Sequence, residues 1–270
     1  MIWRIVFLIL VTLPGLLLLI LCQKIALILR VKNWNFFPKL AHGLLCFNLG
    51  LSVNQIGEPA SDKPTLLVSN HISWMDIPAI GSLSALSFVA KAEVGRWPVV
   101  GFLASLQKTI FVDRTRKTDT GRVADEMGER MSDGRAVLLF AEGTSDIGLH
   151  VLPFRSALVG ATQAAMKNDA LSEMYIQPMA VAYTHLNGLP ISTAERSKIA
   201  WVGDMGIEDN IGDILSCGKK SVTIMYGAPI LVKRDDDRKL VTKKAEDAVR
   251  AMLVALNRQM TLPPAHSPKA

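Results

Sequence analysis

Residues 65–78 of this chain read TLLVSNHISWMDIP, which places His71 and Asp76 directly after an apolar run of strand length. Two residues five positions apart on a regular helix lie about 140° apart around its axis, so their side chains would not meet. Proline is favoured in the first turn of a helix, and Pro78 therefore predicts a helix with Asp76 as its N-cap. The residues before this helix would form a loop, and a loop can fold the carboxylate back onto the imidazole.

A histidine paired with a carboxylate in this way can act as a general base. One ring nitrogen donates to the carboxylate, which fixes the tautomer, and the other can accept a proton from a substrate hydroxyl. A purely structural interpretation is also open, in which Asp76 caps a helix and His71 is a hydrogen-bonded loop residue. Two residues alone do not decide between these interpretations.

Beyond residue 60, short apolar runs alternate with helical patterns, which is typical of an α/β layer architecture. We expect a mixed, largely parallel sheet flanked by helices. The expected strands are residues 65–69, 87–90, 109–112, 136–140, 176–182 and 222–226. The expected helices are residues 77–83, 94–106, 119–131, 156–167 and 237–260.

The N-terminus carries a candidate membrane segment. Residues 5–22 contain no charged side chain and are just long enough for a membrane helix, although Pro14 and Gly15 interrupt the run. No small-residue cleavage site follows, which disfavours a secretory signal peptide. We expect residues 1–40 to anchor the chain as a transmembrane or re-entrant segment, residues 41–262 to form the main domain, and residues 263–270 to be a disordered tail.

The distribution of charge agrees with a membrane location. Within residues 1–60 the single acid is Glu58, and four of the five basic residues follow the apolar run, which places the main domain on the cytoplasmic side. The net charge of +6 suits an anionic membrane surface, and no groove-reading motif supports nucleic-acid binding. The three cysteines are scattered and read as reduced, and the five histidines lack paired ligand spacing, so we expect no metal.

Two further polar clusters follow predicted strands. Glu142, Gly143 and Thr144 come directly after the fourth strand, and Asp113 and Arg114 follow the third. Open α/β sheets bind ligands at the carboxyl ends of their strands. Gly143 can adopt a turn conformation, Glu142 and Thr144 offer an acceptor and a hydroxyl, and Arg114 can hold an anion. An ordinary acidic turn at residues 142–144 is the alternative.

In their order along the chain these clusters resemble the motifs of the glycerolipid acyltransferase family, which includes the 1-acylglycerol-3-phosphate acyltransferases. The resemblance covers roughly residues 60–190. The first motif, Asn-His followed after four residues by Asp, is matched fully. The second is matched at residues 111–114, with Lys108 where a glycine is common, and the fourth is similar to residues 176–181.

The third motif, Phe-Pro-Glu-Gly-Thr-Arg-Ser, is matched in part. Ala141 replaces its proline and Ser145 replaces its arginine, while residues 153–155 match the Pro-Phe-Arg segment that usually follows. In phosphate-accepting members this arginine pairs with the acceptor phosphate, a charge-assisted contact of about 1.5–3 kcal/mol. A serine there indicates a headgroup without phosphate. Residues 141–146 and 151–158 look most like the bacterial lyso-ornithine lipid acyltransferases.

The resemblance implies transfer of a fatty acyl group from a thioester, on acyl carrier protein or coenzyme A, to a lysolipid hydroxyl at the bacterial inner membrane, with no cofactor. His71 would deprotonate the hydroxyl and Asp76 would stabilise the imidazolium, without an acyl-enzyme. The acceptor would be a 3-hydroxyacyl-ornithine, whose carboxylate Arg114 or Arg155 could engage. The implied substrate-binding residues are the motif positions Asn70, Phe111, Asp113, Arg114, Glu142, Gly143, Thr144, Ser145, Arg155 and Pro178.

Two other interpretations remain open at this point. The chain could be a lysophosphatidate acyltransferase whose phosphate contact comes from Lys108, Arg114 or Arg155. It could also be a membrane protein that kept the fold and lost the chemistry, although the intact pair of His71 and Asp76 argues against this. Lys91, Trp74 and Trp97 are candidates for lining an acyl groove, with core packing as the alternative.

Overall fold

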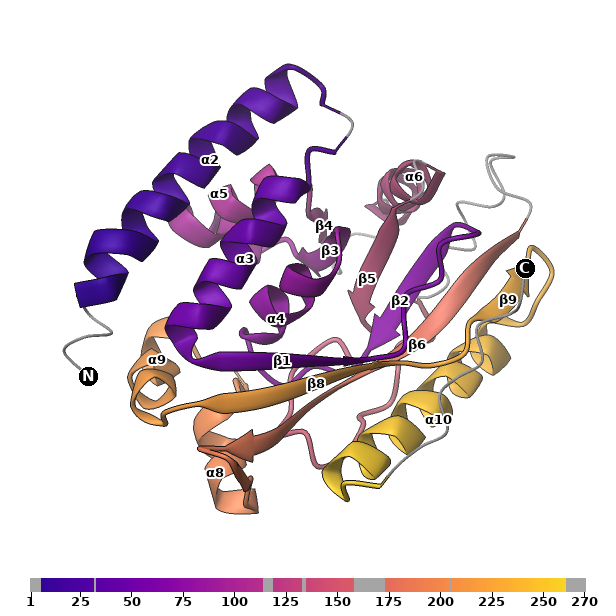
Figure 1. The fold of residues 1–270 in the computed structure, drawn as a ribbon. Helices are drawn as coiled ribbons and strands as arrows, with labels where there is room; N and C mark the ends of the chain where they lie inside the picture. The colour runs from indigo at the N-terminus through magenta and orange to yellow at the C-terminus, as the bar shows by residue number, and fades with distance from the viewer. Residues whose placement is uncertain are drawn as a thin grey trace.

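The computed structural model describes residues 6–31, 33–113, 119–132, 135–157, 173–203 and 205–260. In this part of the chain a mixed sheet has the strand order β1-β8-β6-β2-β5-β3-β4, with β7 and β9 also paired to β6 (Figure 1). The strands are β1 (Leu51–Ile56), β2 (Thr65–Ser69), β3 (Leu86–Lys91), β4 (Ile110–Val112), β5 (Ala136–Phe140), β6 (Glu173–Leu186), β7 (Leu189–Pro190), β8 (Lys220–Tyr226) and β9 (Ile230–Lys233). Parallel pairs join β1 to β8, β2 to β5 and β6, and β3 to β4 and β5, whereas β6 is antiparallel to β7, β8 and β9. The predicted mixed, largely parallel sheet is therefore confirmed.

The central strands are those that the apolar runs predicted. All five residues of β2 are buried, as expected for a parallel strand with helices on both of its faces. The structure also contains β1, β7 and β9, which the sequence did not predict. Four residues of β1 are exposed, and such a strand carries little of the apolar signal on which the prediction depended.

Helices cover both faces of the sheet. The helices of the described residues are α2 (Leu13–Ile28), α3 (Phe36–Leu49), α4 (Asp76–Leu83), α5 (Pro98–Leu106), α6 (Asp119–Ser132), α8 (Thr193–Ile199), α9 (Ile207–Ser216) and α10 (Arg238–Asn257), with a π-helical turn η1 (Leu8–Thr12) and a 3₁₀ turn η2 (Val94–Arg96). Apolar residues of α6 and α10 pack in one core with Leu66 and Val68 of β2. Those of α3, α4, α8 and α9 pack in a second core with Leu67, because successive side chains of a strand point to opposite faces. The site at the end of β2 thus rests on a strand fixed from both sides.

The predicted helix at residues 94–106 is broken in the structure. Trp97 has an extended backbone conformation between η2 and α5, with φ −71° and ψ 125°. Proline disfavours a helical conformation of the residue before it, and Pro98 therefore ends the first turn and begins a new helix. The predicted helices at 119–131 and 237–260 are confirmed by α6 and α10, whereas most of the one at 156–167, and the predicted tail, lie outside the described residues.

The N-terminal apolar segment forms one continuous helix from η1 into α2. By length and composition Leu8–Ile28 could cross a membrane, since its 18-residue apolar window has a mean hydropathy of 2.2 and is 11% buried. It lies against the rest of the chain, since Asn48 of α3 donates to the Thr12 hydroxyl at 2.9 Å and Gln23 donates to the Leu106 carbonyl at 2.7 Å. Figure 1 shows α2 running along the outside of α3. The expected boundary at residue 40 falls inside α3, which packs on both α2 and α4.

Candidate active site

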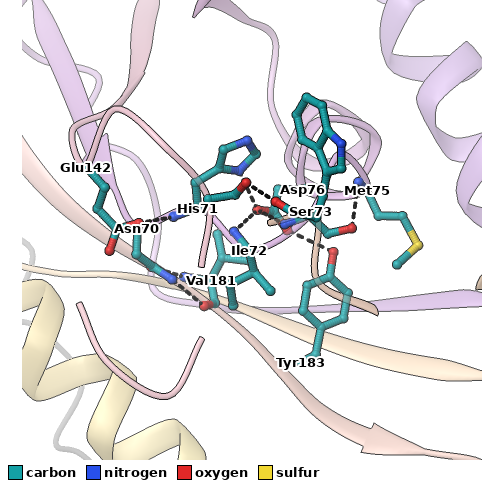
Figure 2. Close-up of polar contacts among 11 residues, drawn as sticks. Asn70, His71, Ile72, Ser73, Met75, Asp76, Glu142, Val181 and Tyr183 are labelled. Carbon is teal, nitrogen blue, oxygen red and sulfur yellow. Dashed lines mark hydrogen bonds and ion pairs between the residues drawn. The ribbon is translucent and has the colours of Figure 1, made fainter. Parts of the chain in front are cut away.

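The loop between β2 and α4 brings His71 and Asp76 together (Figure 2). Asp76 Oδ2 lies 2.8 Å from His71 Nδ1. The same oxygen accepts backbone N–H bonds from Ile72 at 2.7 Å and Ser73 at 3.0 Å. The prediction that Asp76 is the N-cap was wrong, because Met75 is the N-cap and Asp76 is the first helical residue. The carboxylate turns back toward the preceding loop, where it shapes the turn that carries His71.

Tyr183 completes the surroundings of Asp76. Its hydroxyl donates to Asp76 Oδ1 at 2.8 Å, and the Asp76 side chain has no exposed surface. Burial, together with the charge of Asp76, raises the pKa of Tyr183 well above its usual value. The phenol therefore stays protonated and remains a donor. Four donors in total satisfy a carboxylate that would be costly to bury without partners.

The imidazole of His71 lies against two aromatic side chains. Its ring is stacked on Phe140, with 4.0 Å between centroids and 18° between planes, and the indole of Trp201 meets it edge-on at 6.3 Å. An ionised carboxylate can only accept, so His71 Nδ1 carries the proton of this hydrogen bond. The other ring nitrogen, Nε2, is then the basic atom of the pair. This is the chemistry required of a general base.

Glu142 ties two loops together at the site. Its Oε2 accepts the backbone N–H of His71 at 2.7 Å, and its Oε1 accepts that of Leu152 at 2.7 Å. Burial raises the pKa of Glu142 to about 8, although the two backbone donors oppose this shift. We expected this carboxylate to offer an acceptor to the substrate. In the structure it holds the loop of His71 instead.

Asn70 continues the sheet beyond the last residue of β2. Its amide donates to the Val181 carbonyl at 3.0 Å and accepts from the Val181 N–H at 2.9 Å, so it replaces a backbone pair between β2 and β6 (Figure 2). Pro178 lies in β6 opposite Val68, between the part of β6 that pairs with β9 and the part that pairs with β8. A proline has no N–H to donate to a neighbouring strand, and it is tolerated there because the hydrogen-bond ladder is interrupted at this position. Both implied binding residues therefore have structural contacts, away from the pocket described next.

A pocket of about 180 Å³ opens beside His71. Lys91, Trp74 and Trp97, the candidates for lining a groove, all contribute to its wall. Its remaining lining residues are Ile77, Phe88, Val89, Ala90, Val94, Val100, Phe140, Gly143, Thr144, Ser145, Trp201, Gly203 and Ile207. Apart from His71, Lys91 is the one ionisable side chain among these lining residues. The wall is otherwise dominated by apolar and aromatic groups, which suits an acyl chain.

The third-motif residues divide between the pocket and the surrounding backbone. Gly143, at φ 75°, adopts the predicted turn, and it lines the pocket together with Thr144 and Ser145. Arg155 is exposed, and its Nε donates to the Glu142 carbonyl at 3.3 Å. It is outside the set of residues that line this pocket.

The second-motif residues lie along β4. Phe111 pairs with Ala90 of β3, and its carbonyl accepts from Arg122 at 2.7 Å. Asp113 follows the strand, and neither residue lines the pocket beside His71. Arg114 lies outside the described residues. The structure thus brings together the first and third motifs around the pocket and places the described part of the second along its flank.

Tyr183 and Trp201 were missed by the sequence analysis. The predicted strand ended one residue before Tyr183. Val181 and Tyr183 lie on the same face of β6 and belong to the core that contains Leu67. Alternation along a longer strand could have found it. Trp201 follows α8 in a segment without regular structure, and its place beside His71 depends on how α8 and α9 fold back, so no local signal marked it.

Known acyltransferases are similar in sequence to this chain. A profile described as Acyltransferase matches residues 52–182. A lyso-ornithine lipid O-acyltransferase of Brucella abortus (strain 2308) is 38% identical over 229 residues, which cover 84% of this chain and 86% of that protein. This chain belongs to the acyltransferase family. The matched region of this acyltransferase contains the pair of His71 and Asp76, the third-motif loop and Pro178.

One further relative and one solved structure carry a different name. A 1-acyl-sn-glycerol-3-phosphate acyltransferase of Neisseria meningitidis serogroup B is 28% identical over 218 residues, which cover 80% of this chain and 79% of that protein. The crystal structure of the 1-acyl-sn-glycerophosphate (LPA) acyltransferase PlsC from Thermotoga maritima superposes with a TM-score of 0.55 at 18% identity, covering 91% of this chain and 98% of that one. This likeness shows a shared fold.

Among the described residues, no group of three or more His, Cys, Asp or Glu side chains could hold a metal ion. The acid–base chemistry derived above uses His71 and Asp76 alone.

Proposed function

We propose that this acyltransferase moves a fatty acyl group from an acyl thioester to the 3-hydroxyl of lyso-ornithine lipid, giving ornithine lipid. The observation that carries the proposal is Ser145. It stands where phosphate-accepting members of the family have an arginine, and its buried hydroxyl donates to the Trp201 carbonyl. The 38% identity to a lyso-ornithine lipid O-acyltransferase supports the same acceptor.

The reaction requires one proton to move twice. His71 Nε2 takes the proton of the acceptor hydroxyl, and Asp76 stabilises the imidazolium that forms. The resulting alkoxide attacks the thioester carbonyl to give a tetrahedral intermediate. When the carbon–sulfur bond breaks, the imidazolium returns the proton to the leaving thiolate. The products are an ester and a free thiol, and no serine or cysteine nucleophile takes part.

We propose acyl carrier protein or coenzyme A as the thiol carrier of the acyl group. The apolar walls of the pocket beside His71 suit the acyl chain, and Lys91 at this pocket can contact an anionic group of either substrate. Arg155 is turned toward the backbone of Glu142, so we do not assign it the ornithine carboxylate.

We also propose that the helices α2 and α3 hold the enzyme at the bacterial inner membrane, with the domain on the cytoplasmic side. The bonds of Thr12 and Gln23 to α3 and α5 support a hairpin that enters one leaflet over a lone spanning helix. Exposed apolar side chains along η1 and α2, including Leu10, Leu17 and Leu18, would then contact lipid.

The second candidate acceptor is lysophosphatidate. It is supported by the relative from Neisseria meningitidis and by Lys91, which could pair with a phosphate. A competition assay separates the two. Purified protein in detergent receives one acyl carrier protein thioester and equal amounts of lyso-ornithine lipid and lysophosphatidate, and mass spectrometry identifies the products. Ornithine lipid as the main product supports the proposal, whereas phosphatidate as the main product would overturn it.

A further inference from the structure

Trp201 belongs to no helix or strand, but it is hydrogen-bonded to the loops that carry the first and third motifs. Its backbone N–H donates to the Ile72 carbonyl at 2.9 Å, and its carbonyl accepts from the Ser145 hydroxyl. Its indole N–H donates to the Met205 carbonyl. These bonds reach the first motif, the third motif and the segment before α9, so the position of the indole is determined from several directions.

The indole of Trp201 forms part of the pocket wall beside His71. It meets the His71 ring edge-on at 6.3 Å and the Trp97 ring at 6.2 Å, with 73° between the two indole planes. Phe140 covers the His71 ring by stacking on it. A substrate hydroxyl that reaches His71 therefore has aromatic side chains close to its neighbouring carbon atoms.

Ser145 determines how closely the segment of Trp201 approaches the third-motif loop. The side chain of residue 145 is directed at the Trp201 backbone, and Ser145 is only 8% exposed. An arginine at this position is too long to keep this contact. The exchange of arginine for serine thus has a second consequence besides the lost cation, because it lets the segment of Trp201 close against the third-motif loop.

We propose that Trp201 is a specificity-determining residue, whose indole contacts the acceptor's own alkyl chain beside the reacting carbon and is held there by Ser145. This inference rests on the proposed function and deepens it. In a 3-hydroxyacyl amide, the carbon that bears the hydroxyl also carries a long alkyl chain. In lysophosphatidate the corresponding glycerol carbon lies between two CH₂ groups, one bearing the ester oxygen and the other the phosphate oxygen. An aromatic wall at this point favours the first acceptor, since apolar surface gains by leaving water and polar oxygens lose their hydration.

The test measures product ratios and kinetics for matched variants. Wild type, Trp201→Ala, Trp201→Phe, Ser145→Ala and the control Val202→Ala are supplied with one acyl thioester and equal lyso-ornithine lipid and lysophosphatidate. Val202 adjoins Trp201 but does not line the pocket. We expect Trp201→Ala to shift the ratio of ornithine lipid to phosphatidate by about tenfold toward phosphatidate, chiefly through a higher KM for lyso-ornithine lipid. The KM for the thioester should not change.

The remaining variants separate specificity from structure. Trp201→Phe should keep most of the wild-type ratio of ornithine lipid to phosphatidate. Ser145→Ala should shift this ratio in the same direction as Trp201→Ala but less. Val202→Ala should behave as wild type. A ratio that stays constant in Trp201→Ala, whether total activity falls or not, would overturn the inference while leaving the proposed function intact. A wild-type enzyme that makes only phosphatidate would overturn the proposed function, and this inference with it.

Discussion

Tyr183 donates its hydroxyl to Oδ1 of Asp76 at 2.8 Å, although the two residues are 107 positions apart in the chain. Through this bond β6 holds the carboxylate that orients His71. Tyr183 is 1% exposed, and a register shift of the pairing with β8 follows it directly. Such irregularities redirect side chains next to active sites. Asp76 is thus fixed by the loop on one side and by the sheet on the other.

Replacing Tyr183 by phenylalanine should therefore affect both stability and turnover. The change leaves a buried carboxylate oxygen without its donor, which costs about 1–3 kcal/mol of unfolding free energy. We expect kcat to fall about tenfold, since about 1.4 kcal/mol lost in orienting His71 amounts to that factor. Urea unfolding and initial rates measure the two effects. Tyr226→Phe is the control, because Tyr226 is an equally buried residue whose hydroxyl contacts Ser84 instead, and equal losses in both variants would contradict the role of Tyr183.

Gly81 allows α3 and α4 to approach each other. A Cβ atom added there would lie 2.3 Å from Cδ2 of the buried ring of His42, which is far inside van der Waals contact. Gly81→Ala should lower the unfolding free energy by about 1–3 kcal/mol in spite of alanine's higher helix propensity. Gly212→Ala in α9 is the matched control, since nothing lies within 4 Å of its added Cβ. The unfolding free energy of Gly212→Ala should rise by up to about 1 kcal/mol. Thermal unfolding in which Gly81→Ala is the more stable of the two variants would disprove this packing.

The buried carboxyl of Glu142 predicts a pH dependence of stability. Its pKa is raised from 4.5 to about 8, so between these values the folded protein keeps a proton that the unfolded chain releases. Stability is then greatest at the acidic end of this window and falls as the pH rises through it. Glu142→Gln should remove this part of the slope. Urea unfolding of both proteins across the window measures it, and identical slopes would show that Glu142 does not titrate there.

Restoring the family's arginine at position 145 should change the acceptor preference. Ser145→Arg loses the contact with the Trp201 carbonyl and adds a cation near the pocket. We expect turnover of lyso-ornithine lipid to fall about tenfold and the fraction of phosphatidate to rise. Ser145→Leu is the control, because it displaces Trp201 without adding charge and should not increase the absolute rate with lysophosphatidate. No gain in the arginine variant over the leucine variant would contradict the argument from the missing arginine.

The sequence predicted the sheet well because its central strands are continuous apolar runs. The runs at 65–69 and 136–140 coincide with β2 and β5 to the residue. The pairing of His71 with Asp76 also followed from local features, since a strand, a short loop and Pro78 leave few ways to connect them. What local features could not supply was the direction of the Asp76 carboxylate, which is set by the N–H groups of Ile72 and Ser73.

The rest of the site depends on contacts between distant segments. Asn70 and Glu142, predicted to bind substrate, lie near His71, and their side chains bond the backbone of β6 and of two loops. A motif shows which residues occur together and does not show which of them a substrate touches. Tyr183 and Trp201 reach the site from segments whose positions depend on the complete sheet and on α8 and α9.

The role of His71 is tested by the rate of ester formation by His71→Ala with an acyl thioester and lyso-ornithine lipid, measured by mass spectrometry beside wild type. We expect a loss of at least about a hundredfold, since a positioned general base contributes roughly 10²–10⁴-fold. Circular dichroism shows whether the variant is folded. A folded His71→Ala enzyme that forms ornithine lipid at the wild-type rate would show that His71 does not deprotonate the acceptor.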